Sequence, residues 1–154
     1  NFHGVGRRCQ HYPEIQHAGK TALLIDDYGH HPVELKATLS ALRGAYPEKR
    51  MVLIFQPHRY TRTRDLFDDF VSVLSDVDHL IITEVYPAGE KPIALADGRA
   101  LVRAIRLQGN ENAIFAEDIV DAKRKLFNIL QQDDLVVTMG AGSVGKLPAM
   151  LNND

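Results

Sequence analysis

Five short apolar runs, separated by stretches with helical periodicity, constrain the fold of this chain more than any other feature. They are rich in Val, Ile and Leu, as expected for strands buried on both faces, and they read TALLID (21–26), MVLIFQ (51–56), HLIITEV (79–85), AIFA (113–116) and DLVVTM (134–139). Amphipathic helical patterns fill the gaps, at residues 32–46, 63–77, 96–109 and 117–132. This alternation predicts an α/β fold with an open, mostly parallel sheet covered by helices on both faces.

The beginning of the chain does not follow this alternation. The segment CQHYPEIQHAGKTALL is typical of a hairpin that leads into the first parallel strand. One edge strand of the sheet is therefore expected to run antiparallel to its neighbour. The first helix is expected to begin at Pro32, since proline suits the first helical position, and to end near Gly44.

Length and composition are those of an ordinary globular domain. The chain has 154 residues, 45% hydrophobic and 25% charged, so residues 1–154 are expected to form one domain. A formal net charge of −2 gives no general attraction to nucleic acid or membranes, and no apolar run is long enough to span a bilayer. The one cysteine, Cys9, excludes an internal disulfide and suits a reducing compartment. Because the chain begins with Asn1 rather than Met, we expect a piece of a longer protein.

Polar loops that follow the predicted strands contain most of the unusual residues. The loop DDYGHHP follows the first parallel strand, QPHRYTRT follows the second and YPAGEKP follows the third. Together the first two contain His30, His31, His58, Arg59, Arg62 and Arg64. Because ligands of open α/β sheets bind outside the carboxyl ends of the strands, this edge is the expected ligand site.

In the loop DDYGHHP, two carboxylates end a strand and therefore point to opposite faces of the sheet. Either Asp26 or Asp27 can reach the ligand edge, where an aspartate suits the hydroxyl groups of a ribose, while the other caps the next helix. The alternative is that both carboxylates only cap the strand end. A zinc site at His30 and His31 is disfavoured, because adjacent histidines rarely chelate one ion and no further ligands complete a site.

In the loop QPHRYTRT, Arg59 and Arg62 lie at the start of a predicted helix. Cations at this position oppose the helix dipole, so an anionic ligand would explain their presence. A guanidinium group pairs well with a carboxylate or a phosphate. The alternative is a solvated basic surface.

Two motifs that suggest nucleotide binding fail on context. The turn from Gly140 to Gly145 spells GxGxxG after a strand, but only nine residues follow it, too few for the helix, strand and acidic residue of a dinucleotide site. The segment HAGKT resembles the end of a P-loop, yet Glu14 stands where that motif needs glycine. The backbone amides of the glycine turn can still lie against a ligand or close the sheet tightly.

The strings FHGVGRR, DDYGHHPVE, FQPHRYTRTRDLFDDF, EVYPAGEKPI and GAGSVGK, in this order, closely resemble the C-terminal domain of the Mur ligase family. The resemblance covers the chain from Phe2 to about Lys146. It implies a Rossmann-like three-layer sandwich with a six-stranded sheet and one antiparallel edge strand. It also implies the third domain of a cytoplasmic enzyme of peptidoglycan synthesis, behind a UDP-sugar domain and a central ATPase domain that this chain lacks.

Within this family, the strings are most similar to members that use ATP to join L-alanine to UDP-N-acetylmuramate. The resemblance implies that ATP and Mg²⁺ act in the full-length enzyme, whereas no cofactor is expected on this chain alone, which should fold without catalysing. Arg8 is expected to approach the ATP phosphates and Asp27 the ribose. The residues expected around the incoming amino acid are Tyr28, His30, His58, Arg59 and Arg62. The glycine turn becomes a family feature that implies no nicotinamide.

Three alternatives remain open on the sequence. The chain resembles, more weakly, the family members that reattach a recovered tripeptide to UDP-N-acetylmuramate. The glycine turn leaves a stand-alone Rossmann-like nucleotide-binding domain or oxidoreductase as a second possibility. A non-catalytic module whose basic loops capture a phosphate- or carboxylate-bearing partner is the third.

Overall fold

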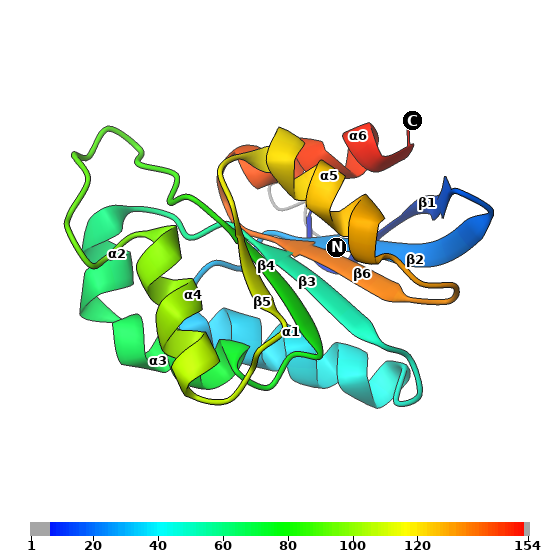
Figure 1. The fold of residues 1–154 in the computed structure, drawn as a ribbon, viewed down its shortest axis with the longest axis horizontal. Coiled ribbons are helices and arrows are strands. Elements are labelled where there is room, and N and C mark those ends of the chain that lie inside the picture. The colour runs from blue at the N-terminus through cyan, green and yellow to red at the C-terminus, as the bar shows by residue number, and fades with distance from the viewer. Residues whose placement is uncertain (1–6, 153–154) are drawn as a thin grey trace.

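A computed structural model describes residues 7–152 of the chain, which form one six-stranded sheet with helices on both faces (Figure 1). The strands are β1 (Gln10–His17), β2 (Lys20–Asp27), β3 (Met51–Phe55), β4 (His79–Thr83), β5 (Ala113–Ala116) and β6 (Leu135–Met139). The helices are α1 (Pro32–Ala45), α2 (Tyr60–Asp65), α3 (Phe67–Leu74), α4 (Gly98–Leu107), α5 (Ile119–Ile129), the short 3₁₀ helix η1 (Ser143–Lys146) and α6 (Leu147–Asn152).

The sheet has the order β1-β2-β6-β3-β4-β5, and the pairs from β2 to β5 are all parallel. Strand β1 pairs antiparallel with β2 at one edge, as the sequence predicts. The chain crosses from β2 to β3 through α1. It later returns from β5 through α5, which places β6 between β2 and β3. The carboxyl ends of β2, β6, β3 and β4 therefore lie side by side at one edge of the sheet.

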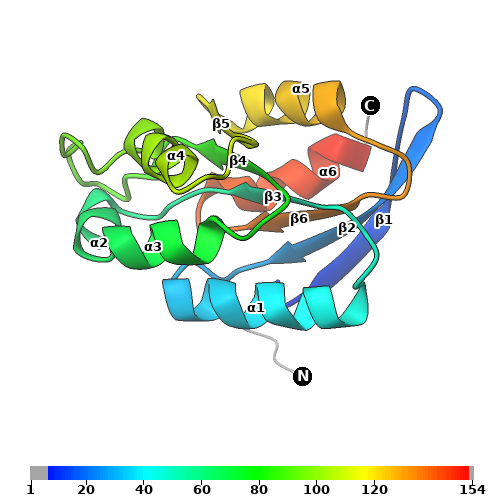
Figure 2. The same cartoon turned by 60° about the horizontal axis from the view of Figure 1, so that its bottom comes forward.

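Two hydrophobic cores lie on the two faces of the sheet. One contains apolar residues of α1, α3 and α4, and the other contains residues of α5 and α6, so the fold has three layers (Figure 2). Because side chains alternate along a strand, β3 sends Leu53 and Phe55 into the first core and Val52 and Ile54 into the second. The predicted three-layer α/β sandwich is confirmed.

The hairpin between β1 and β2 is the segment that resembles the end of a P-loop. Its two turn residues, Ala18 and Gly19, have φ angles of 54° and 79°. Two consecutive residues with positive φ form the tight turn that matches the twist of antiparallel strands. The segment HAGKT is therefore a hairpin turn in this fold.

Two predictions about local structure are wrong in detail, and one helical segment was not predicted. The helix predicted over residues 63–77 is two helices, α2 and α3, separated at Leu66, whose φ of −115° lies outside the helical range. Neither Asp26 nor Asp27 caps α1; His31 does, by accepting a hydrogen bond from the Val33 amide. The glycine turn continues into η1 and α6, which the sequence pattern did not indicate.

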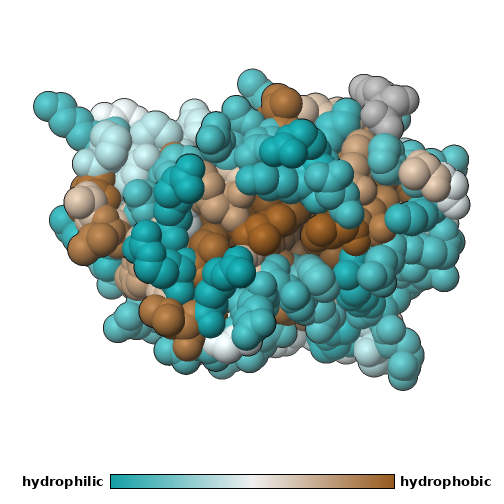
Figure 3. All heavy atoms as spheres, in the orientation of Figure 1, coloured by the Kyte–Doolittle hydropathy of each residue, from teal (hydrophilic) through white to brown (hydrophobic). Residues whose placement is uncertain are grey.

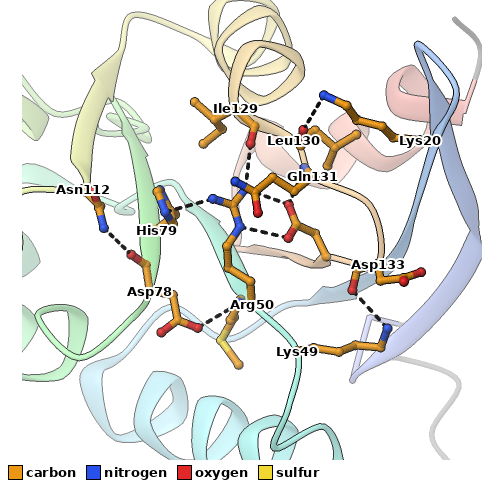
Figure 4. A network of polar contacts seen from close by, with 12 residues as sticks. Lys20, Lys49, Arg50, Asp78, His79, Asn112, Ile129, Leu130, Gln131 and Asp133 are labelled. Carbon is orange, nitrogen blue, oxygen red and sulfur yellow. Dashed lines mark hydrogen bonds and ion pairs between the residues drawn. The ribbon is translucent and has the colours of Figure 1, made fainter.

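A polar network ties the amino ends of three strands together, at the opposite end of the sheet from the histidine-bearing loops (Figure 4). Arg50, just before β3, donates to both carboxylate oxygens of Asp134, at 2.9 and 2.8 Å. It also donates to the Ile129 carbonyl oxygen at 2.6 Å and lies 2.9 Å from Nε2 of His79. One guanidinium therefore joins β3, β4, α5 and the start of β6.

The surface of the domain combines hydrophobic and hydrophilic regions (Figure 3). Within residues 7–152, no helix is long and apolar enough to cross a bilayer. On the face drawn in Figure 1, hydrophobic atoms form a central band surrounded by hydrophilic atoms (Figure 3). Ile114, Phe127 and Ile129 pack against the second core while remaining partly exposed.

Candidate functional site

Asp27 ends β2 and is almost fully buried, with 3% of its surface exposed. Its Oδ1 accepts the Cys9 amide at 2.8 Å, and its Oδ2 accepts the Gly29 amide at 2.9 Å and the Thr38 hydroxyl at 3.3 Å. The carboxylate therefore shapes the loop after β2. It also lies directly below that loop, at the edge where a ligand would bind.

Asp26 points to the other face of the sheet, as predicted, and pairs with an arginine from the N-terminal segment. Arg7 donates to both of its oxygens, at 2.6 and 3.1 Å, and the Thr138 hydroxyl donates at 2.6 Å. Asp26 is fully buried. Of the two adjacent arginines, Arg7 is thus held in place, whereas Arg8 is exposed.

The start of α1 positions the two neighbouring histidines. Glu34 accepts hydrogen bonds from the amides of His30 and His31, at 3.0 and 3.1 Å, and completes a capping box with the His31 side chain. Burial acts to raise the pKa of Glu34, but the two amide hydrogen bonds and the nearby charges of His30 and Arg8 together lower it below its ordinary value. His31 is thereby used as a helix cap, while the ring of His30 is left at the site.

An isolated β-bridge beyond the strand ends joins the loop after β3 to the loop after β4. His58 and Tyr86 form an isolated parallel bridge, in which Tyr86 donates to the Pro57 carbonyl and accepts the Arg59 amide, both at 2.8 Å. Residues paired in this way project on the same side of the ladder. Their rings consequently stack, with centroids 5.4 Å apart and planes 13° from parallel.

Four aromatic rings form a row across the carboxyl ends of β2, β3 and β4. Tyr28 and His30 meet edge to face at 5.3 Å, His30 and His58 lie 5.6 Å apart, and Tyr86 follows at the end. Both tyrosines are 38% exposed, so part of each ring is accessible from solvent. This row of rings offers a ligand both apolar ring faces and imidazole nitrogens.

Two arginines, Arg59 and Arg62, flank this row of rings. Arg62 donates to the His58 carbonyl at 3.3 Å and lies 3.4 Å from its Nδ1. Arg59 lies 3.7 Å from Glu90, whose carboxylate is itself held by the amide and hydroxyl of Thr61. The backbone of Arg59 has a φ of 75°, a conformation that costs about 1–3 kcal/mol in a residue with a side chain and that concentrates at functional sites.

Burial and the neighbouring charges together set the protonation state of His58. Burial lowers the pKa of His58 below its ordinary value, and the charges of His30, Arg62 and Arg59 lower it further, while Glu90 opposes them. The imidazole is therefore neutral at neutral pH. Two guanidinium groups beside the neutral imidazole of His58 and the aromatic faces make a site for a small anion, such as a carboxylate.

The glycine turn after β6 is packed against this site. Gly142 lies so close to Tyr86 that a Cβ there would stand 2.5 Å from its Cγ, and 2.7 Å from Oε1 of Gln56. Gln56, buried at the end of β3, accepts the Val144 amide at 3.0 Å and donates to the Ser143 hydroxyl at 2.9 Å. The turn is thereby joined to the β3 and β4 loops.

The other two glycines of the turn also face protein atoms. A Cβ on Gly140 would lie 2.8 Å from the Gln56 carbonyl oxygen, and one on Gly145 would lie 2.8 Å from the Arg7 guanidinium. Each glycine of the GxGxxG string thus permits a close approach by a side chain or by backbone of this domain. Side chains of the domain, including Tyr86, occupy the space next to the turn, where a dinucleotide would need to lie.

The structure gathers the residues that the sequence singled out. At the carboxyl edge lie Arg8, Asp27, Tyr28, His30, His58, Arg59 and Arg62. Direct contacts join Tyr28 to His30, His30 to His58, and His58 to Arg62. Sequence reasoning missed Tyr86 and Glu90, although both lie in the loop after the third parallel strand; their contacts depend on pairing beyond the strand ends.

Comparison with known proteins identifies the family. The family model described as "Mur ligase, glutamate ligase domain" matches residues 7–142. A UDP-N-acetylmuramate–L-alanine ligase of Neisseria meningitidis is 63% identical over 151 residues, which are 97% of this chain and 32% of that protein. The corresponding ligase of Thiobacillus denitrificans is 57% identical over 155 residues, covering 99% of this chain and 34% of that protein. The chain thus spans about a third of the length of these relatives.

Solved structures show the same fold at lower identity. A UDP-N-acetylmuramate-alanine ligase from Thermotoga maritima superposes with a TM-score of 0.70 at 23% identity, over 96% of this chain and 29% of that one. A murein peptide ligase from Psychrobacter arcticus gives a TM-score of 0.69 at 18% identity, over 99% and 31% of the two chains. With a family model that covers most of its length, the chain belongs to the Mur ligase family, in which it is similar to the glutamate ligase domain.

Proposed function

We propose that this chain is the C-terminal domain of an ATP-dependent ligase that joins L-alanine to UDP-N-acetylmuramate in peptidoglycan synthesis. The observation that carries the proposal is the row of rings flanked by Arg59 and Arg62, an anion site at the edge where such a sheet binds ligands. Its support is the high identity to curated L-alanine ligases over nearly the whole chain. In this proposal, the UDP-sugar domain and the central ATPase domain belong to the rest of a cytoplasmic enzyme.

On the amino-acid side, the two arginines would hold the carboxylate of L-alanine. Arg62 directs an N–H group at Nδ1 of His58, so Nε2 carries the imidazole proton and can donate to the same anion. Keeping His58 neutral matters, because a third adjacent cation would be repelled by Arg59 and Arg62. The residues of this chain would thus bind and orient the amino acid for attack.

On the nucleotide side, Arg8 and Asp27 would contact ATP. The exposed guanidinium of Arg8 suits a phosphate group, and the carboxylate of Asp27 suits a ribose hydroxyl. A ribose would share that carboxylate with the Cys9 and Gly29 amides. ATP supplies activation of the sugar-linked carboxylate as an acyl phosphate, while Mg²⁺ and the P-loop belong to the central domain.

A pair of arginine variants in the full-length ligase tests the amino-acid role. Arg59→Ala removes a charge from the site, and loss of a charge pair worth about 3 kcal/mol raises the KM for L-alanine roughly 10²-fold. Arg64→Ala is the matched control, because Arg64 is exposed and pairs with its neighbour Asp65. Equal KM values for the two variants would remove Arg59 from the site.

A further inference from the structure

The ring of Tyr86 is held between His58 and the glycine turn. One of its faces stacks on the imidazole of His58, and its Cβ and Cγ lie against Gly142. Its backbone is fixed on both sides, by the Pro57 carbonyl and by the Arg59 amide. No role for this residue was predicted from the sequence, yet it contacts both the loop after β3 and the glycine turn after β6.

We propose that Tyr86 is a positioning residue of the amino-acid site, which fixes the plane of the His58 imidazole so that Nε2–H faces the carboxylate of the incoming amino acid. The inference rests on the proposed function and extends it. It explains why the third position of the GxGxxG string is glycine in a chain where no dinucleotide is implied. Only a residue without Cβ leaves room for the Tyr86 ring beside His58.

Orientation matters because two ring nitrogens of His58 have different tasks. Arg62 lies 3.4 Å from Nδ1, which therefore acts as the acceptor and leaves Nε2 as the donor. A half-turn of the ring about the Cβ–Cγ bond would put a carbon in the place of each nitrogen, so the contact with Arg62 and the N–H donor towards the substrate carboxylate would both be lost. A stacked neighbour at 5.4 Å resists this rotation on one face, while His30 contacts the imidazole at 5.6 Å.

The titration of His58 measures this arrangement without any catalytic assay. Burial is the main cause of its lowered pKa, and the charged or titratable groups that face it are His30, Arg59, Arg62 and Glu90. Removing the Tyr86 ring exposes one face of the imidazole to water. The pKa of His58 should then rise towards its ordinary value, because the four facing groups are unchanged.

The test uses NMR titration of the imidazole resonances in the 154-residue chain. Tyr86→Ala is expected to raise the pKa of His58, and Tyr86→Phe, which restores the ring, is expected to bring it back. Tyr46→Ala is the matched control, since Tyr46 lies at the far end of α1 and is also partly buried. An unchanged His58 titration in Tyr86→Ala, or an equal shift in Tyr46→Ala, would overturn the proposal.

A second variant approaches the same contact from the other side. Gly142→Ala places a methyl group against Tyr86 and should displace the ring, so it should shift the His58 titration although it does not touch His58. In the double variant with Tyr86→Ala, the two effects should not add, because the contact through which Gly142 acts is already gone. Additive shifts would show that Gly142 acts by another route.

Kinetics of the full-length ligase then separate this proposal from the proposed function. Tyr86→Ala should raise the KM for L-alanine roughly tenfold, the ratio that corresponds to about 1.4 kcal/mol, with a smaller change in kcat. A KM equal to that of the parent protein would contradict the positioning role. If the parent protein itself shows no L-alanine-dependent turnover, the proposed function fails, whereas the NMR result still decides whether Tyr86 orders His58.

Discussion

Loss of Arg50 is expected to destabilise the domain more than loss of any exposed arginine. The substitution Arg50→Ala leaves the carboxylate of Asp134, which is 1% exposed, with the Gln131 amide at 2.8 Å and without its two bonds to the guanidinium. It also removes the donor to the Ile129 carbonyl. Breaking a buried pair from one side costs about 3–5 kcal/mol, because the remaining charge stays desolvated.

Thermal and urea unfolding of the 154-residue chain, followed by circular dichroism, measures this loss. For a domain of this size, each kcal/mol lowers Tm by about 2–4 °C, so Arg50→Ala should lower Tm by roughly 6–20 °C. The control is Arg64→Ala, whose partner Asp65 is 61% exposed in its side chain, and which should change stability by less than about 0.5 kcal/mol. Equal Tm values for the two variants would refute the reasoning.

A double variant identifies the cause of the loss. If the penalty arises from the stranded carboxylate, replacing both partners, as Arg50→Met with Asp134→Leu, should recover at least half of the stability lost in Arg50→Ala. A double variant as unstable as the single one would mean that the contacts of Arg50 with His79 and Ile129 dominate instead.

Two further predictions separate structural from functional side chains. Arg7→Ala should lower the free energy of unfolding by about 3–5 kcal/mol, because its partner Asp26 is fully buried. Arg8→Ala should leave the free energy of unfolding within about 0.5 kcal/mol of the parent and weaken ATP use in the full ligase. The reverse pattern would exchange the roles of the two arginines. Burial and the bond to Glu84 raise the pKa of Tyr60 from 10.0 to about 12, so its contribution to stability is present below pH 10 and is lost as the pH rises towards 12. Tyr60→Phe should therefore remove the most alkaline component of the tyrosinate absorbance titration, and an unchanged titration curve would contradict the assignment.

Much of the fold could be predicted because its signals are local. The five apolar runs coincide with β2 to β6 within two residues at each end, since strands buried on both faces need continuous apolar sequence. Asp26 and Asp27 point to opposite faces because side chains alternate along a strand. The break at Leu66 was missed because neither glycine nor proline stands there to mark the end of a helix.

The candidate site was predictable in its location but not in its contacts. Strand ends in the sequence place His30, His58, Arg59 and Arg62 at one edge, and the structure gathers them there. The stack of Tyr86 on His58 depends instead on an isolated β-bridge between two loops, which no periodic pattern in the sequence predicts. Whether these residues bind L-alanine and ATP stays a prediction.

The roles of adjacent residues of one type were equally hidden in the sequence. Arg7 and Arg8 have the same chemistry, and only the three-dimensional pairing with Asp26 distinguishes the buried partner from the exposed cation. The same holds for His30 and His31, of which one faces the aromatic row and the other caps α1. Such assignments depend on contacts with residues far apart in the sequence or on local cap geometry, which sequence patterns do not specify.

Phosphate release from ATP by the full-length parent protein tests the central claim most directly. The reaction would contain UDP-N-acetylmuramate and Mg²⁺, with either L-alanine or the recovered tripeptide as the acceptor. The account predicts release that depends on L-alanine and that falls in Arg59→Ala while persisting in Arg64→Ala. Release that depends only on the tripeptide would assign the chain to a recycling ligase, and release with neither acceptor would contradict the ligase function altogether.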